Sequence, residues 1–160
     1  MVGNFDKAFE LVLLFEGGYS NDRNDSGGET KFGISKRAYP SENIADLTED
    51  RAKEIYLADY WQKSRCSDLP YPIDLIHFDA AVNCGVKKAN ILLQISINER
   101  RNEMIKVDGT IGKQTLNAIT DPEGIANNYL FNRVRYYVQL NKPVFLAGWI
   151  NRILSLRVRI

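Results

Sequence analysis

Apolar residues at helical spacing dominate this 160-residue chain from end to end. The spacing predicts helices from Asn4 to Gly17 or Gly18 and over residues 49–63, 73–84, 87–98, 123–140 and 144–156, with a short one after Gly112. The sequence also predicts one short β-hairpin, near residues 30–34. With 44% hydrophobic residues, the chain can form one well-buried core or two small lobes that share one. We therefore predict a mainly α fold in one compact unit.

Glu16 lies where an apolar run, FELVLLF (9–15), meets a loop rich in glycine, asparagine, aspartate and serine, residues 16–35. A carboxyl group half sheltered by hydrophobic side chains has its ionised form disfavoured, so it can serve as a general acid near neutral pH. The alternative is a solvated carboxylate at a helix C-terminus, where the helix dipole is unfavourable to it. The glycines that follow would admit a substrate, and they favour the catalytic interpretation.

The loop after Glu16 supplies three candidates for a second polar group, namely Asp22, Asp25 and Thr30. Glycoside hydrolysis by inversion requires two carboxyl groups and a bound water. In this hypothesis Glu16 protonates the leaving oxygen, while one aspartate and Thr30 hold a water on the opposite face of the sugar. The alternative is that the aspartates form Asx-turns and that Thr30 is an ordinary hairpin residue.

Positive charge is concentrated at the C-terminal end of the chain. Residues 125–160 contain six Lys and Arg and no Asp or Glu, which leaves 15 of the 21 basic residues and all 20 acidic ones before them. Solvated arginines along helix faces are the favoured interpretation, and a surface for an anionic cell wall, membrane or nucleic acid is the alternative. The aromatic residues among these arginines are spaced like core residues: Tyr129, Phe131, Tyr136, Tyr137 and Trp149. Because no recognition motif accompanies the charge, we expect no nucleic-acid partner.

The chain offers little for metal or cofactor chemistry, and we expect neither. Its one histidine, His77, excludes a multi-histidine metal site and is predicted to be a helix residue with a hydrogen-bond partner. Cys66 and Cys84 lie in no CxxC or Cys/His cluster, and we expect reduced thiols. Tyr60 and Trp61 could stack on sugars, but their spacing favours the core.

Residues 16–35, EGGYSNDRNDSGGETKFGIS, resemble the signature EGGYxxDPxDxGGxTxxGI of the phage-type N-acetylmuramidases of glycoside hydrolase family 108. Further motifs resemble the rest of that family: YLADYW (56–61), FDAAVNCG (78–85), VDGTIGKQTL (107–116) and FLAGWINR (145–152). The resemblance implies a lysozyme-like helical fold with a small loop or hairpin region after the first helix. It also implies a catalytic region, 1–95, and a helical peptidoglycan-binding-like region, 96–160, packed together as one unit.

The resemblance further implies cleavage of the β-1,4 bond between N-acetylmuramic acid and N-acetylglucosamine, with Glu16 as the catalytic acid. We assign Asp25 and Thr30 as its partners, because eight and then four residues separate the three, close to the eight and five of phage lysozymes of another family. Asp22 is the rival to Asp25. The candidate substrate-binding residues are Tyr19, Gly28, Phe32 and Asn83. The chain departs from the family at Arg23, where proline is usual, and at Cys84, where histidine is common.

We therefore predict a monomeric peptidoglycan hydrolase, an N-acetylmuramidase that acts in phage lysis or in wall remodelling. One alternative is a lytic transglycosylase, in which a single Glu serves as acid and base. Another is a wall-binding or secretion-associated protein without catalysis. The N-terminal segment lacks a basic leader and a cleavage site, and its apolar stretch is too short to cross a membrane. We expect synthesis in a bacterial or phage-infected cytoplasm, no stable membrane insertion, and action on the wall after export or lysis.

Overall fold

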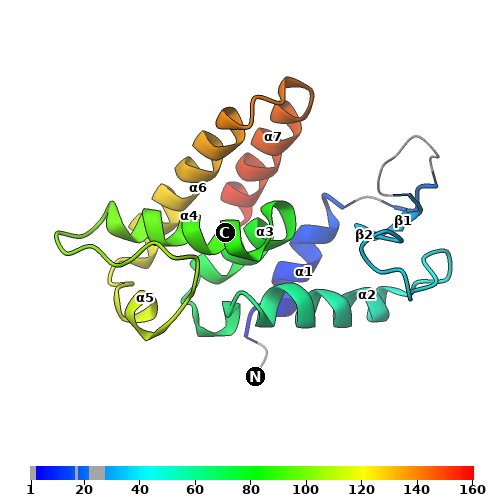
Figure 1. Cartoon of the computed structure of the whole chain (residues 1–160), viewed down its shortest axis with the longest axis horizontal. Coiled ribbons are helices and arrows are strands. Elements are labelled where there is room, and N and C mark those ends of the chain that lie inside the picture. The colour runs from blue at the N-terminus through cyan, green and yellow to red at the C-terminus, as the bar shows by residue number, and fades with distance from the viewer. Residues whose placement is uncertain (1–2, 17, 22–27) are drawn as a thin grey trace.

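The computed structural model describes residues 3–16, 18–21 and 28–160. These residues form helices joined by loops, together with one small antiparallel hairpin (Figure 1). The elements are α1 (Phe5–Leu13), β1 (Thr30–Lys31), β2 (Ile34–Ser35), α2 (Glu49–Tyr56), the π-helix η1 (Leu57–Gln62), the 3₁₀ helix η2 (Cys66–Asp68), α3 (Ile73–Cys84), α4 (Val86–Asn98), α5 (Lys113–Asn117), α6 (Pro122–Gln139) and α7 (Pro143–Arg159). The predicted mainly α fold, with a hairpin after the first helix, is confirmed.

Side-chain caps and prolines define where the helices begin. Thr48 caps α2 as predicted, because its hydroxyl oxygen accepts a hydrogen bond from the Arg51 backbone N–H at 3.2 Å. Asp121 caps α6 in the same way, and Pro122 follows in the first turn. The sequence predicts that the second helix continues to residue 63. The chain does remain helical, but beyond Tyr56 it is the π-helix η1, so the predicted helix type is wrong for that part.

α1 is shorter than the sequence predicts. It ends at Leu13 instead of Gly17 or Gly18, because the Phe15 N–H bonds to the Val12 carbonyl at 2.9 Å and tightens the last turn. The Glu16 N–H also bonds to the Val12 carbonyl, at 3.2 Å. Glu16 therefore lies just beyond the helix, in the turn that closes it.

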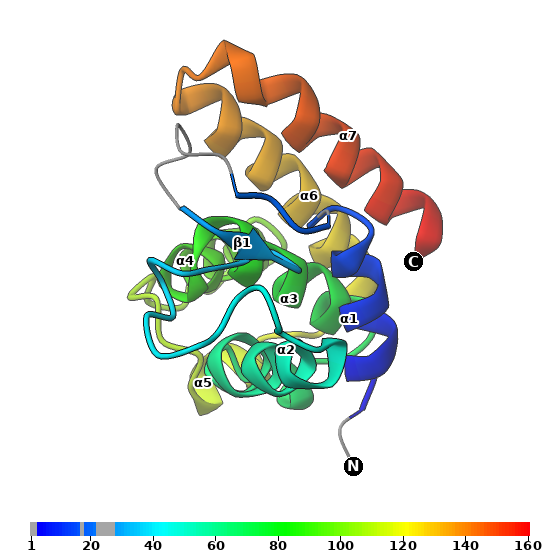
Figure 2. The ribbon, with the colours of Figure 1, turned by 90° about the vertical axis from the view of Figure 1, so that its right-hand side faces the viewer.

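α3 is the central helix of the core. Every residue from Ile73 to Ala81 is buried, and α1, α4 and α6 all pack against this helix (Figure 1, Figure 2). Phe78 meets Trp61 edge to face, with the ring centroids 5.5 Å apart. Because Trp61 is only 1% exposed, it is a core residue as predicted and not a sugar-stacking surface.

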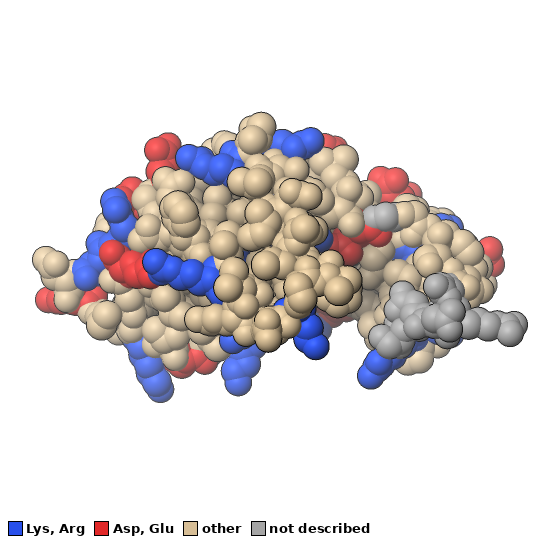
Figure 3. Space-filling view, turned by 90° about the horizontal axis from the view of Figure 1, so that it is seen from above, with Lys and Arg blue, Asp and Glu red and all other residues tan. Residues whose placement is uncertain are grey.

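α6 and α7 form an antiparallel helical hairpin, and α6 attaches it to α3 and α4 (Figure 2). The sequence favours solvated arginines along these helices. That expectation is wrong for Arg133 and Arg152, which are 0% and 6% exposed, and it is confirmed for Arg157 and Arg159. Lys and Arg side chains are scattered over the face seen in Figure 3 and do not gather into one patch. Part of the C-terminal charge is therefore used inside the fold.

The aromatic residues of this hairpin are divided between core and surface. Tyr129 and Tyr137 are buried as predicted, but Phe131 is 67% exposed, so its assignment to the core is wrong. Its exposure does not make α6 a membrane span. Within the described ranges, no helix combines the length and the apolar character needed to cross a bilayer.

His77 is a satisfied core histidine, as predicted. It is fully buried on α3, and its Nδ1 and Nε2 form hydrogen bonds with the Tyr129 hydroxyl at 2.8 Å and with Asn90 Oδ1 at 3.0 Å. Burial lowers the pKa of His77 to about 4, so the ring is neutral at physiological pH.

We predict that His77 makes the fold sensitive to acid. The unfolded chain binds a proton at His77 below about pH 6.5, whereas the folded protein binds it only near pH 4. The stability that neutral His77 contributes is therefore fully present above pH 6.5, and about 3 kcal/mol of it is lost as the pH falls through 4. Urea unfolding between pH 7 and pH 4 measures this loss. The His77→Gln variant should lack this part of the slope, and equal slopes in the two proteins would contradict the assignment.

Candidate active site

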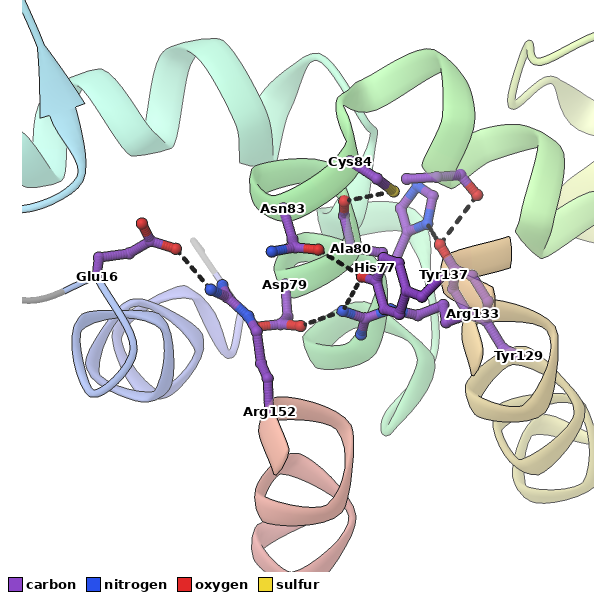
Figure 4. A network of polar contacts seen from close by, with 11 residues as sticks. Glu16, His77, Asp79, Ala80, Asn83, Cys84, Tyr129, Arg133, Tyr137 and Arg152 are labelled. Atoms are coloured by element: carbon purple, nitrogen blue, oxygen red, sulfur yellow. Dashed lines mark hydrogen bonds and ion pairs between the residues drawn. The ribbon is translucent and has the colours of Figure 1, made fainter. Parts of the chain in front are cut away.

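Glu16 and Arg152 form a salt bridge that joins the two ends of the chain. Glu16 Oε1 accepts a hydrogen bond from Arg152 Nη1 at 2.6 Å (Figure 4). The Phe15 ring lies 5.0 Å from the guanidinium carbon, within the range of a cation–π contact. The Glu16 side chain remains 20% exposed, whereas the Arg152 side chain is 7% exposed. Glu16 thus has the half-sheltered position that its sequence predicts, with a cation beside it that the sequence did not reveal.

The turn of the β1–β2 hairpin packs directly on Glu16. Phe32 and Gly33 connect the strands, and both have positive φ, 52° and 75°, as type I′ turns require. A Cβ atom at Gly33 would lie 2.6 Å from Glu16 Oε2 and 2.6 Å from the Tyr56 hydroxyl. Only glycine lets the turn approach the carboxyl group this closely.

Tyr56 holds this turn in place. Its hydroxyl donates a hydrogen bond to the Phe32 carbonyl at 2.9 Å. Burial and, after it, the negative charge of Glu16 raise the pKa of Tyr56 well above its usual value of 10. The hydroxyl therefore stays protonated and acts as a donor. Tyr56 belongs to one of the family motifs, but its part in the site was not predicted from the sequence.

Thr30 lies on β1, in the hairpin whose turn touches Glu16. Its backbone pairs with Ser20 through two hydrogen bonds of 2.8 Å, which brings the hairpin beside the segment that follows Glu16. Its hydroxyl donates to the Gly28 carbonyl at 3.1 Å, so the lone pairs of the hydroxyl oxygen can still accept a hydrogen bond. Asp22 and Asp25, the two candidate partners, lie outside the described residues.

The four predicted substrate-binding residues occupy two regions. Tyr19 and Gly28 lie at the start of the hairpin region, where the Tyr19 hydroxyl donates to Glu29 Oε1 at 2.8 Å. Phe32 is in the turn on Glu16. Asn83 lies near the C-terminal end of α3, where its Oδ1 accepts a hydrogen bond from the Tyr137 hydroxyl (Figure 4).

A buried ion-pair network connects these regions, and the sequence did not predict it. Asp79 Oδ1 accepts from Arg152 Nε at 2.8 Å, and Asp79 Oδ2 accepts from Arg133 Nη2 at 2.6 Å. Arg133 Nη2 also donates to the Tyr137 hydroxyl at 3.1 Å, which extends the network to Asn83. One signal was available in the sequence. Asp79 is an acid in a helix predicted to be buried, and a buried carboxylate requires a cationic partner.

Cys84 replaces the histidine that is common in the family, and the structure places it beside the network as a neutral thiol. Its Sγ donates to the Ala80 carbonyl at 3.0 Å, and burial raises the pKa of the thiol to about 11. In the part of the chain that the structure describes, no group of three or more His, Cys, Asp or Glu residues could hold a metal ion.

The two carboxyl groups on Arg152 are suited to different chemistry. Both oxygens of Asp79 accept from arginines, and its side chain is 2% exposed, so it is a structural anion. Glu16 has one oxygen on Arg152 and the other beside the hairpin turn, with part of its surface open to solvent. A hollow separates the helical body from the hairpin region, and acidic side chains are visible within it (Figure 3). Glu16 is therefore open to contact with a ligand, whereas Asp79 is enclosed.

Comparisons with known proteins identify matching families and a similar fold. The family model described as Glycosyl hydrolase 108 matches residues 9–85, and the model described as Predicted Peptidoglycan domain matches residues 88–154. The solved structure of Brucella abortus SagA is 30% identical in sequence, with a TM-score of 0.84. The match covers 98% of this chain and 93% of that one, and with it the predicted lysozyme-like fold is confirmed. A search of curated proteins found no match.

We predict that Gly33→Ala destabilises the fold strongly. The added methyl group would meet Glu16 and Tyr56 at a position whose φ already disfavours any side chain. Gly3→Ala is the matched control, because Gly3 also has positive φ but its Cβ would meet nothing closer than 3.9 Å. We expect Gly33→Ala to lower the free energy of unfolding by about 1–3 kcal/mol more than Gly3→Ala does. Equal losses in urea unfolding would show that the turn does not press on the carboxyl group.

Proposed function

We propose that this chain, which belongs to the glycosyl hydrolase 108 family, is an N-acetylmuramidase with Glu16 as the general acid. The family makes the chain a glycosidase, and the matched peptidoglycan domain indicates peptidoglycan as its substrate. The scissile bond would be the β-1,4 bond between N-acetylmuramic acid and N-acetylglucosamine. The observation that carries the proposal is the unequal state of the two Glu16 oxygens. Oε1 is held by Arg152, whereas Oε2 lies beside the hairpin turn, in a side chain that is 20% exposed.

In the proposed reaction, the proton leaves from Oε2. It passes to the glycosidic oxygen as the bond from that oxygen to the anomeric carbon breaks, and the sugar becomes oxocarbenium-like. The electron pair of the broken bond stays on the leaving oxygen, which the proton neutralises. Oε1 remains on Arg152 throughout, so the negative charge that develops on Glu16 faces a cation.

The second polar group in this proposal is Asp25, assisted by Thr30, and Asp22 is the rival to Asp25. The aspartate would accept a proton from a water that attacks the anomeric carbon from the opposite face, which gives inversion. Thr30 supports the proposal through its hydroxyl, which donates to the Gly28 carbonyl and so leaves its lone pairs for a hydrogen bond from that water.

A lytic transglycosylase acting on the same substrate is the second candidate. It needs one carboxyl group only, and the described part of the site supplies one in Glu16, while Asp79 is bound by two arginines. The two reactions leave different groups at the end of the cleaved glycan strand. Mass spectrometry of digested peptidoglycan would find ordinary reducing ends after hydrolysis and 1,6-anhydro ends after transglycosylation, and the second result would replace the muramidase proposal.

We predict that Glu16→Gln lowers the rate of wall digestion by about 10²–10⁴-fold, the usual contribution of a general acid. The amide keeps the shape of the side chain but has no proton to give at neutral pH. Loss of turbidity of purified cell walls measures the rate. Glu10→Gln is the control, because Glu10 is an exposed acid on α1. Equal activity of the wild type and Glu16→Gln would remove Glu16 from the mechanism, and wild-type protein without any activity would favour a wall-binding role.

We predict that Asp25→Asn lowers turnover of soluble glycan strands by about 10²-fold or more, because the amide cannot accept the proton of the attacking water. Asp22→Asn should remain close to the wild type. The two variants differ by three positions in one loop, so each is the control for the other. The reverse pattern would assign the role to Asp22, and full activity of both variants would exclude these two aspartates.

A further inference from the structure

Arg152 lies in the segment that matches the peptidoglycan model, yet its guanidinium binds the proposed catalytic acid of the other segment. Its side chain is 7% exposed, so it is not available to bind the wall from the surface. Glu16 and Arg152 are 136 residues apart in sequence, and their contact crosses from the turn after α1 to the middle of α7 (Figure 4).

The orientation of Arg152 is fixed from several sides. Its Nε donates to Asp79 on α3, while Nη1 donates to Glu16, so one planar guanidinium joins two carboxyl groups. The second oxygen of Asp79 is held by the fully buried Arg133 of α6, and the Phe15 ring lies against the Arg152 guanidinium. Arg152 cannot turn away from Glu16 without breaking its buried ion pair with Asp79.

This arrangement restricts Glu16, which would otherwise be free to move. Glu16 follows the end of α1, and its side chain has three rotatable bonds, so many rotamers could place Oε2 away from a substrate. The salt bridge fixes Oε1, and the Phe32–Gly33 turn limits the space around Oε2. A reacting group held in this way avoids the entropy loss that a mobile one incurs at each turnover.

We propose that Arg152 is a positioning residue for Glu16, so that α7, in the segment matching the peptidoglycan model, completes the catalytic site. This inference rests on the proposed role of Glu16. Arg152 does not touch the substrate. It sets the direction of Oε2 through Oε1, and it faces the charge left on Glu16 after proton transfer. The C-terminal segment is accordingly part of the catalytic unit, and removing it would remove activity as well as binding.

The test compares Arg152→Gln with Arg157→Gln on the same helix, where Arg157 is exposed. With soluble glycan strands as substrate, we expect Arg152→Gln to lower kcat by about 10–100-fold, as misplacement of a reacting group by about 1 Å does, while KM stays within about twofold. The control should match the wild type. An Arg152→Gln variant with wild-type kcat, in a protein that Glu16→Gln inactivates, would overturn the positioning role and leave the proposed function intact.

The activity per folded molecule distinguishes positioning from simple loss of folded protein. Circular dichroism measures the folded fraction of Arg152→Gln, and kcat is then referred to that fraction. A positioning role predicts that kcat per folded molecule is still lowered by about 10–100-fold. A wild-type kcat per folded molecule with a reduced folded fraction would mean a structural role only.

Arg152→Lys keeps the inference testable if the glutamine variant does not fold. Lysine retains the positive charge beside Asp79 but lacks the planar fork that bridges two carboxyl groups. We expect a folded protein whose kcat is about tenfold below the wild type and above that of Arg152→Gln where the latter folds. Wild-type kcat in Arg152→Lys would show that charge alone suffices, and the positioning role would be wrong.

Discussion

The ion-pair network that runs from Glu16 through Arg152 and Asp79 to Arg133 is the interaction on which the rest of the site depends. Its inner members are almost completely buried, and burying charges is costly unless each finds partners of opposite sign. The network contains two cations and two carboxylates, so its charges balance. Removing one member would leave an uncompensated charge in the core. The position of Glu16 therefore depends on the packing of α3, α6 and α7, which carry the other members.

The ion-pair network also joins the two segments that the family models match. Asp79 belongs to residues 9–85, and both arginines belong to residues 88–154. Both arginines turn inward, and one of them reaches the carboxyl group of Glu16 in the other segment. The two matched segments are therefore joined through ion pairs that lie largely in the core.

Apolar spacing in the sequence predicted the helices well, because each helix must bury a stripe along its own length. Local chemistry also predicted the Thr48 cap, the hairpin and the position of Glu16. Asp79 in a buried helix signals that some cation pairs with it, but the partners could not be predicted, since the contacts join residues 54, 73 and 136 positions apart. Exposure is the usual state of arginine, and nothing local to Arg133 or Arg152 indicates otherwise. The conformation of the Phe32–Gly33 turn could not be predicted either, because Phe32 has positive φ, which bulky residues seldom adopt.

The different states of Asp79 and Glu16 show how one arginine can serve structure and chemistry together. Each carboxyl group accepts a hydrogen bond from Arg152, at 2.8 Å and 2.6 Å, so the distances alone do not separate them. Their remaining oxygens do. The second oxygen of Asp79 binds Arg133 in a closed interior, whereas the second oxygen of Glu16 meets a glycine turn in a side chain that is 20% exposed. Of the two carboxyl groups, only that of Glu16 therefore lies in a side chain that is partly open to solvent.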